Sequence, residues 1–264
     1  MTPRQIRLAR ALLHAHRTHA HLALLFDYDG TLTPIVAHPR LARLDRAMRA
    51  VLRRLASRPD VSLGIISGRS LDDLRRLTRI PRAILAGTCG LEIEREGVAL
   101  YGVARGPTRT AIRRIMKSLQ SVLEPYRGAW IEDKQIALTV HYRAVAARQA
   151  ARVRQCAFQV LGKYAKTVQW TEGPKAIEIL PELGVNKGTA VRKIVRRLAL
   201  AGPAVFYAGD ATNDIEAFRS VRELGGLAAK IGGKPIKQAK HHLASPAKLR
   251  EVLAWLEAEL VRKR

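Results

Sequence analysis

Cysteine is scarce in this sequence of 264 residues, because only Cys89 and Cys156 are present. Two cysteines cannot build a disulfide framework or a cage of metal-bound thiolates. The sequence therefore predicts a protein of a reducing compartment, which we take to be the cytoplasm.

Long hydrophobic runs are missing as well, since none approaches the roughly 18–20 residues of a membrane-spanning helix. We expect no membrane partner. The first 25 residues are basic, and no acidic residue precedes Asp27. Their apolar segment Ala11-Leu12-Leu13 is too short for a secretory signal. A transit peptide stays open as an alternative, but we favour an N-terminal helix packed beside the first strand.

Acidic residues are few, with 22 Asp and Glu against 47 Lys and Arg, so the formal net charge is +25. Such a charge attracts anions, including phosphate esters and nucleic acids. The basic residues are scattered over the whole sequence, often as pairs on the polar sides of predicted helices, and form no single stripe. We interpret them as solvated helix faces, so nucleic acid is not the expected partner. A nucleic-acid-binding protein remains an alternative.

Hydrophobic residues make up 47% of the sequence, and the apolar segments alternate in type. Short buried runs indicate strands at 22–26, 61–66, 83–86 and 204–208. Helical spacing indicates helices at 43–57, 70–78 and 187–198, from 213, and from 246. Because strands and helices alternate with short connections, the sequence predicts an α/β fold with a doubly wound parallel sheet. A hairpin is expected at 91–101, with its turn at Glu96-Gly97.

The middle of the sequence follows a different order, in which each of two helices precedes a hairpin. The helices are expected at 108–123 and 145–161, and the strands at 130–133, 136–143, 167–171 and 175–180. The predicted turns are Lys134-Gln135 and Glu172-Gly173-Pro174. This order indicates a small sheet with helices on one face. We therefore predict an α+β insert at 107–178 within a discontinuous core domain of residues 1–106 and 179–264.

Polar side chains stand where the strands of the predicted parallel sheet end. They are Asp27 and Asp29, the segment Ser67-Gly68-Arg69, and Asp210 with Asp214, while Lys187 begins a helix. Because the carboxyl ends of parallel strands meet at one edge of a sheet, we expect these groups to converge. Each has a plainer interpretation when taken alone: a surface turn for Asp-x-Asp or Ser-Gly-Arg, and a helix start for Asp214. Their joint occurrence carries the prediction.

The expected convergence suits phosphoryl transfer. Asp27 and Asp29 point to the same side of an extended chain, so one carboxylate can attack phosphorus while the other protonates the leaving oxygen. Asp27 and Asp210 offer the oxygen ligands that Mg²⁺ prefers. Lys187 adds positive charge, and Ser67 with the neighbouring backbone N–H groups can hold a phosphate oxygen. A phosphotransferase or mutase with the same nucleophile stays open.

Four segments resemble the motifs of the haloacid dehalogenase superfamily of phosphatases: Phe-Asp-Tyr-Asp-Gly-Thr from Phe26, Ser-Gly-Arg from Ser67, Asn-Lys-Gly from Asn186, and Gly-Asp-Ala-Thr-Asn-Asp from Gly209. The resemblance implies a haloacid dehalogenase-like core with a cap domain at 107–178. It implies Asp27 as nucleophile and Asp29 as general acid and base. Phosphate-binding residues would be Ser67, Gly68 and Lys187. The Mg²⁺ set would be Asp27, Asp29, Asp210 and Asp214.

Within that superfamily, the sequence is similar to the trehalose-6-phosphate phosphatases from Leu24 onward. Segments that carry this similarity are Gly87-Thr88-Cys89-Gly90-Leu91-Glu92, Glu132-Asp133-Lys134, His141-Tyr142-Arg143 and Ile177-Glu178-Ile179. The resemblance implies hydrolysis of trehalose 6-phosphate, with the sugar bound by Arg69, Glu132, Lys134, Arg143 and Glu178. Glu132, Lys134 and Arg143 have an alternative interpretation as exposed strand residues that pair across their hairpin.

Three departures from that family's pattern keep other sugar phosphates open. Ala211 stands where the family usually carries a second acid, Asn213-Asp214-Ile215 stands where it carries Thr-Asp-Glu, and Cys89 stands where it carries a histidine. The motif from Gly209 to Ile215 is more similar to that of the general superfamily, which includes sucrose-phosphate and mannosyl-phosphoglycerate phosphatases. Another sugar-phosphate phosphatase is therefore the alternative function.

Overall fold

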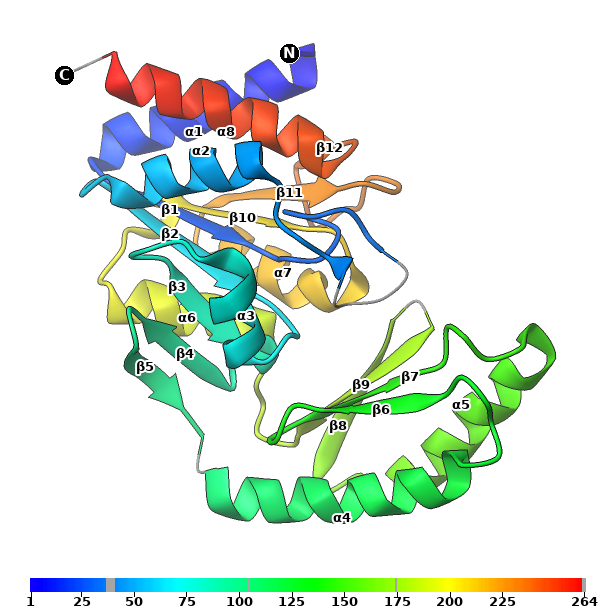
Figure 1. Ribbon diagram of the computed structural model, residues 1–264. Coiled ribbons are helices and arrows are strands. Elements are labelled where there is room, and N and C mark those ends of the chain that lie inside the picture. Colours follow the sequence, from blue (N-terminus) through cyan, green and yellow to red (C-terminus); the bar gives the residue numbers. More distant parts are fainter. Residues whose placement is uncertain (37–40, 104, 174, 263–264) are drawn as a thin grey trace. The chain divides into compact units, whose positions relative to one another are not determined.

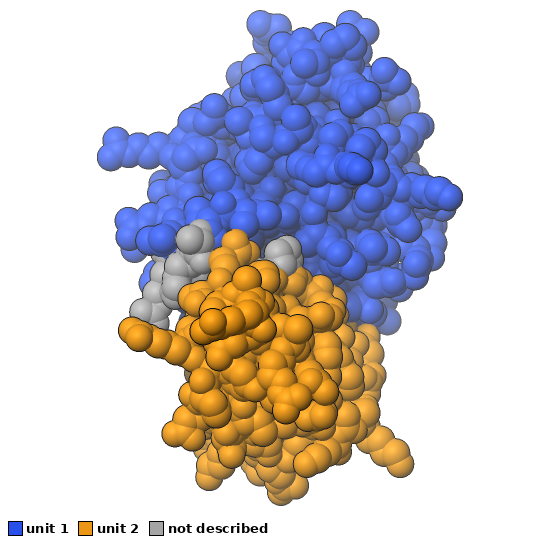
Figure 2. All heavy atoms as spheres, turned by 90° about the vertical axis from the view of Figure 1, so that its right-hand side faces the viewer, with its two compact units in different colours: residues 1–101, 186–264 blue, residues 102–185 orange. Residues whose placement is uncertain are grey.

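A computed structural model shows the fold of the chain and describes all residues except 37–40, 104, 174 and 263–264. The chain forms two compact units, which Figure 2 colours separately. Unit 1 comprises residues 1–101 and 186–264, and unit 2 comprises residues 102–185. The insert predicted at 107–178 falls inside unit 2, a few residues from each of its bounds.

Unit 1 is built on an eight-stranded sheet with the order β12-β11-β10-β1-β2-β3-β4-β5. Its strands are β1 (Leu22–Phe26), β2 (Val61–Ile66), β3 (Ile84–Gly87), β4 (Glu92–Arg95), β5 (Val98–Gly102), β10 (Val205–Gly209), β11 (Leu227–Ile231) and β12 (His241–Leu243). Neighbouring strands from β12 to β3 run parallel, and β4 is antiparallel to β3. The predicted parallel α/β sheet is confirmed.

Helices cover both faces of this sheet (Figure 1). On one face lie α1 (Pro3–His19), α2 (Arg46–Ser57) and α8 (Pro246–Val261), and on the other α6 (Lys187–Arg197) and α7 (Ile215–Glu223). A short helix, α3 (Leu71–Thr78), follows β2. Side chains of β1 alternate between the layers: Leu24 packs in the core beneath α1 and α8, and Leu25 in the core above α6 and α7. The strand is buried on both sides, as its continuous apolar run predicts.

The predicted N-terminal helix is present as α1. Thr2 caps it, because its hydroxyl accepts a hydrogen bond from Gln5 N while the Gln5 side chain accepts one from Thr2 N. Gln5 Nε2 also donates to Glu251 Oε2 at 2.6 Å, which ties α1 to α8. Within the described residues, no helix is both long enough and apolar enough to cross a membrane.

Unit 2 is a four-stranded antiparallel sheet with the order β6-β7-β9-β8. The strands are β6 (Trp130–Asp133), β7 (Leu138–His141), β8 (Val168–Gly173) and β9 (Ala176–Pro181), and the helices are α4 (Arg105–Leu123) and α5 (Ala147–Gly162). Both helices pack on one sheet face through a shared apolar core. The expected α+β arrangement with helices on one face is therefore what unit 2 has.

The ends of β7, β8 and β9 differ from the prediction by one or two residues. β7 ends at His141 and not at Arg143, because the chain turns after Tyr142, where Val145 N donates to Tyr142 O. Residues 172 and 173 were expected in a turn, but Gly173 pairs with Ala176 in the ladder. Position 174, the last of the expected turn residues, lies outside the described residues. Lys175 has a φ of 62°, which suits a tight hairpin turn.

Candidate active site

Asp27 lies at the carboxyl end of the central strand β1. From β1 the chain moves to β2 on one side and later returns to β10 on the other, so this strand end is a topological switch point. The N–H of Asp27 donates to Ala208 O at 2.9 Å, and its Oδ1 accepts a hydrogen bond from Tyr28 N at 2.7 Å. The backbone therefore holds this carboxylate at the place where open parallel sheets bind ligands.

Lys187 bridges two buried carboxylates. Its Nζ lies 2.8 Å from Oδ1 of Asp27 and 2.8 Å from Oδ1 of Asp214. The lysine is the first residue of α6, which Asn186 caps by accepting a hydrogen bond from Thr189 N. Burial opposes the charge of Lys187, but the two carboxylates outweigh it and hold its pKa well above the ordinary value. This ammonium is therefore a fixed positive charge beside Asp27.

Asp214 organises the loop after β10. Its Oδ2 accepts hydrogen bonds from Asp210 N at 2.9 Å and Ala211 N at 2.8 Å. Its Oδ1 accepts from Tyr207 OH at 2.6 Å as well as from Lys187 Nζ. Fully buried, the carboxylate is thus held by four donors, which is what a buried charge requires. Tyr207 was not predicted as a site residue. Its sequence signal is a phenol in a buried strand, which needs a hydrogen-bond partner.

Asp27, Asp210 and Asp214 offer oxygen atoms that all lie within 4.8 Å of one another. Burial raises the pKa of Asp27 well above its usual range, against the pull of Lys187, and Asp214 and Asp210 add to the rise. Burial and Asp214 also raise the pKa of Asp210 to about 6. The cluster is therefore short of positive charge, and a divalent cation would supply it.

Two further features fit a cation at this cluster. Oδ1 of Asp210 is buried and has no hydrogen-bond partner in the described part of the chain. Gly30, with a φ of 79°, lies so close that a Cβ there would be 2.1 Å from Oδ2 of Asp210. Any side chain at position 30 would therefore collide with this carboxylate, and glycine keeps the space beside it open. The carboxylate oxygens of the cluster suit an ion that prefers hard oxygen ligands.

The carboxylate of Asp29 is not part of this group. It pairs with Arg69, whose Nε and Nη2 donate to Oδ2 and Oδ1 of Asp29 at 2.7 Å each. The structure thus brings the carboxylate of Asp29 next to Arg69, a residue predicted to bind substrate. Of the predicted metal ligands, Asp27, Asp210 and Asp214 are the ones whose side-chain oxygens come together, and Asp29 stays a predicted ligand.

The segment Ser67-Gly68-Arg69 leaves β2 next to Asp27. Ser67 is buried, its N–H donates to Ala86 O, and its Oγ accepts from Arg69 N at 3.2 Å. Cys89 N donates to Ser67 O at 2.8 Å from a left-handed conformation with a φ of 57°. The loop after β3 therefore braces the loop after β2. Gly68 is half-buried between these anchored neighbours.

Four of the predicted sugar-binding residues lie in unit 2. Lys134 is buried, donates from Nζ to Thr139 Oγ1 at 2.7 Å, and lies 3.6 Å from Oε1 of Glu178. Glu132 lies beside them, with its Oε2 2.8 Å from Nε2 of His141. Glu132 on β6 and Glu178 on β9 lie on either side of β7, and Lys134 directly follows β6. Arg143 lies in the turn after β7 and has an exposed side chain.

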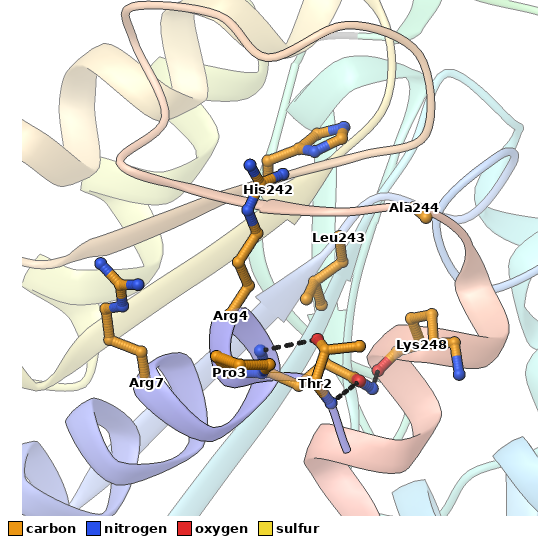
Figure 3. A pocket seen from close by; sticks show the side chains of 9 residues that line it. Thr2, Pro3, Arg4, Arg7, His242, Leu243, Ala244 and Lys248 are labelled. Atoms are coloured by element: carbon orange, nitrogen blue, oxygen red, sulfur yellow. Dashed lines mark hydrogen bonds between the residues drawn. The ribbon is translucent and has the colours of Figure 1, made fainter.

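A separate cavity of about 460 Å³ lies in unit 1 where α1 and α8 begin (Figure 3). Its lining includes the basic residues Arg4, Arg7, His242 and Lys248. Of the described residues that line it, none is a predicted site residue. The cavity lacks a carboxylate nucleophile, so the cluster around Asp27 is the candidate active site.

A doubly wound sheet with a carboxylate at the end of its central strand, a bridging lysine and a carboxylate cluster is the arrangement of the haloacid dehalogenase superfamily of phosphatases. Within that class, the chain belongs to the trehalose-phosphatase family, whose model matches residues 25–251. It is a phosphoric monoester hydrolase.

Individual relatives agree with this assignment. The chain is 32% identical to trehalose-6-phosphate phosphatase of Escherichia coli over 238 residues, which cover 90% of this chain and 86% of that protein. It is 29% identical to trehalose 6-phosphate phosphatase RA3 of Zea mays, covering 89% of this chain and 69% of that one. The C-terminal domain of Candida albicans trehalose-6-phosphate phosphatase has the same fold, with a TM-score of 0.83 at 24% identity over 95% of this chain and 96% of that one.

Proposed function

We propose that this chain hydrolyses trehalose 6-phosphate to trehalose and phosphate. The observation that carries the proposal is the contact of Lys187 with both Asp27 and Asp214 at the switch point of a chain that belongs to the trehalose-phosphatase family. The relatives from Escherichia coli and Zea mays are named for this substrate. The proposal therefore combines two observations. The site has groups suited to phosphoryl transfer, and the family's named substrate is a sugar phosphate ester.

In the proposed mechanism, Asp27 attacks the phosphorus atom. The bond to the sugar oxygen breaks, and an aspartyl phosphate forms. Asp29 gives a proton to the leaving oxygen and later takes one from the water that hydrolyses the aspartyl phosphate. Lys187 offsets the repulsion between the Asp27 carboxylate and the phosphate dianion. Ser67 and the N–H of Gly68 hold phosphate oxygens.

Asp27, Asp210 and Asp214 would hold Mg²⁺, which prefers carboxylate oxygens. When bound, the ion neutralises negative charge on the cluster and on the phosphoryl group. In the same proposal, unit 2 acts as the cap domain, and its residues Glu132, Lys134 and Glu178, together with Arg143, bind sugar hydroxyls through charge-assisted hydrogen bonds.

The test is phosphate release from a panel that contains trehalose 6-phosphate, sucrose 6-phosphate, mannosyl-3-phosphoglycerate and glucose 6-phosphate. We expect trehalose 6-phosphate to have the highest kcat/KM. Equal rates on all four, or a preference for another ester, would reject the assignment. Ala211 and Ile215, which depart from the family's pattern, favour sucrose phosphate or mannosyl-phosphoglycerate as the substrate in that case.

Two controls show whether the chemistry belongs to this site. Asp27→Asn removes the nucleophile but keeps the size of the side chain, so turnover should vanish while the melting temperature shows a folded protein. EDTA should abolish turnover, and added Mg²⁺ should restore it. Full activity in EDTA would exclude the metal from the mechanism.

A further inference from the structure

The segment 87–91 connects β3 with β4 and keeps three consecutive residues in the left-handed region, because φ is 49° at Thr88, 57° at Cys89 and 97° at Gly90. A β-branched residue rarely adopts this conformation. The hydroxyl of Thr88 is also buried, and its Oγ1 has no hydrogen-bond partner among the described residues. Both features cost free energy, so the neighbours of the segment must impose its conformation.

One neighbour of this segment is the loop that follows β2. Thr88 N donates to Arg69 O at 2.7 Å, and Cys89 N donates to Ser67 O at 2.8 Å. The two hydrogen bonds fasten the backbone on both sides of Gly68, whose N–H is proposed to hold a phosphate oxygen. The left-handed conformation of Thr88 and Cys89 therefore aims two successive N–H groups at one loop.

Two glycines of the segment allow further close approaches. A Cβ at Gly87 would lie 2.6 Å from Leu71 N, at the start of α3. A Cβ at Gly90 would lie 2.5 Å from Cβ of Ala190, in the first turn of α6. That helix begins with Lys187, the ammonium beside the proposed nucleophile. The segment thus lies between the proposed phosphate-binding loop and the helix that carries the lysine.

We propose that this segment is a positioning element of the active site, which sets the distance between the loop after β2 and helix α6. The inference rests on the proposed phosphoryl transfer, whichever sugar ester is the substrate. Gly87 acts on Arg69 and, through that guanidinium, on Asp29. Gly90 acts on Lys187. The competing explanation is a segment that only stabilises unit 1.

Gly90→Ala tests the contact with the helix. The added methyl group would push α6 away and move Lys187 from the reacting carboxylate. Because the ammonium offsets negative charge for every phosphate ester, we expect kcat/KM to fall by about tenfold or more, alike on trehalose 6-phosphate and p-nitrophenyl phosphate. Gly97→Ala is the control for backbone strain and should keep wild-type rates. Gly97 has a φ of 80°, and a Cβ there meets no atom within 4 Å in the described structure.

Gly87→Ala tests the contact with the loop, and it carries no backbone penalty because φ is −86°. The methyl group would displace Leu71 N and, two residues earlier, Arg69. We expect kcat/KM on trehalose 6-phosphate to fall by about tenfold or more, since Arg69 orients the proposed general acid. p-Nitrophenyl phosphate, whose leaving group departs without a proton, should lose less. Wild-type rates in both variants, or losses that only follow the melting temperature, would overturn the proposal.

A second substitution separates positioning from stability. Ala190→Gly removes the methyl group that Gly90→Ala meets, but it lowers helix propensity and leaves the strained φ in place. The double variant Gly90→Ala/Ala190→Gly should therefore regain most of its kcat/KM without regaining its melting temperature. A merely structural role cannot give this result. Activity that stays lost in the double variant would show that the contact with α6 is not the cause.

Binding of orthovanadate, measured by calorimetry with Mg²⁺ present, provides a readout that does not depend on turnover. This phosphate analogue carries no sugar, so its Kd should rise by about tenfold or more in Gly90→Ala and recover in the double variant. If the wild type prefers another ester while this pattern holds, the proposed substrate fails and the positioning element stands. An unchanged Kd in Gly90→Ala, or no binding to the wild type, refutes the element even if trehalose 6-phosphate is hydrolysed.

Discussion

The guanidinium of Arg69 holds the carboxylate of Asp29 in a two-pronged ion pair, with both N···O distances at 2.7 Å. The Arg69 side chain is only 8% exposed and its Cζ lies 5.3 Å from the centre of the Tyr28 ring, whereas Asp29 is 41% exposed. A buried, well-packed cation therefore fixes the orientation of an accessible carboxylate. For a general acid, that orientation decides which oxygen can reach the leaving group.

Arg69→Lys should weaken hydrolysis of esters that need a general acid. Lysine keeps the charge but loses the planar fork that holds both oxygens of Asp29. We expect kcat on trehalose 6-phosphate to fall by about 10²-fold or more, because general acid catalysis contributes about 10²–10⁴-fold. p-Nitrophenyl phosphate, whose leaving group departs without a proton, should lose much less. Equal losses on both esters would contradict a positioning role. Arg76→Lys, at an exposed pair with Asp73, is the control.

Lys187→Met should destabilise the fold as well as stop turnover. The substitution leaves Asp27 and Asp214 buried without the ammonium that now lies 2.8 Å from each. Breaking a buried pair in this way costs about 3–5 kcal/mol. Urea unfolding at neutral pH measures the loss. The double variant Lys187→Met/Asp27→Asn should regain part of it, because one uncompensated charge is gone; a loss unchanged by the second substitution would show that charge is not the cause.

The sequence predicts the parallel sheet and the strand ends that carry Asp27, Ser67 and Asp210, since period and order along the chain determine both. It does not reveal which charges pair. Asp29 faces Arg69 and not the carboxylate cluster because the loops after β1 and β2 approach each other, and that approach is tertiary. β11 and β12 were not predicted: β12 has only three residues and includes His241 and His242, so its apolar signal is weak. Tyr207 was missed because its role depends on the fold of the loop that places Asp214.

His241 should make the protein less stable in mild acid. Burial, together with the charges of Lys240 and Arg7, lowers the pKa of this side chain, and its buried Nε2 has no hydrogen-bond partner among the described residues. The unfolded chain then binds a proton more readily than the folded one. The contribution of neutral His241 to the free energy of unfolding is therefore complete above the unfolded pKa of about 6.5, and it is lost as the pH falls from there through the lower pKa of the folded state. The free energy of unfolding, measured from about pH 7.5 to about pH 5.5, should fall more steeply for wild type than for His241→Leu. Parallel slopes would exclude this histidine as the source.

Gly30→Ala should inactivate the enzyme through one methyl group, and Gly97→Ala provides a matched comparison. Both glycines have nearly the same left-handed conformation, with φ of 79° and 80°. A Cβ at position 97 meets no atom within 4 Å in the described structure, whereas one at position 30 would lie 2.1 Å from Oδ2 of Asp210. Each alanine carries the backbone penalty, about 1–2 kcal/mol.

Only Gly30→Ala also displaces a proposed Mg²⁺ ligand. We expect turnover of Gly30→Ala to fall by about 10²-fold or more, and the Mg²⁺ concentration needed for half-maximal rate to rise by about tenfold or more. Gly97→Ala, which carries the backbone penalty alone, should keep wild-type kinetics at a somewhat lowered melting temperature. If both variants keep wild-type Mg²⁺ dependence, the carboxylate of Asp210 does not hold the ion, and the proposed metal set would have to be revised.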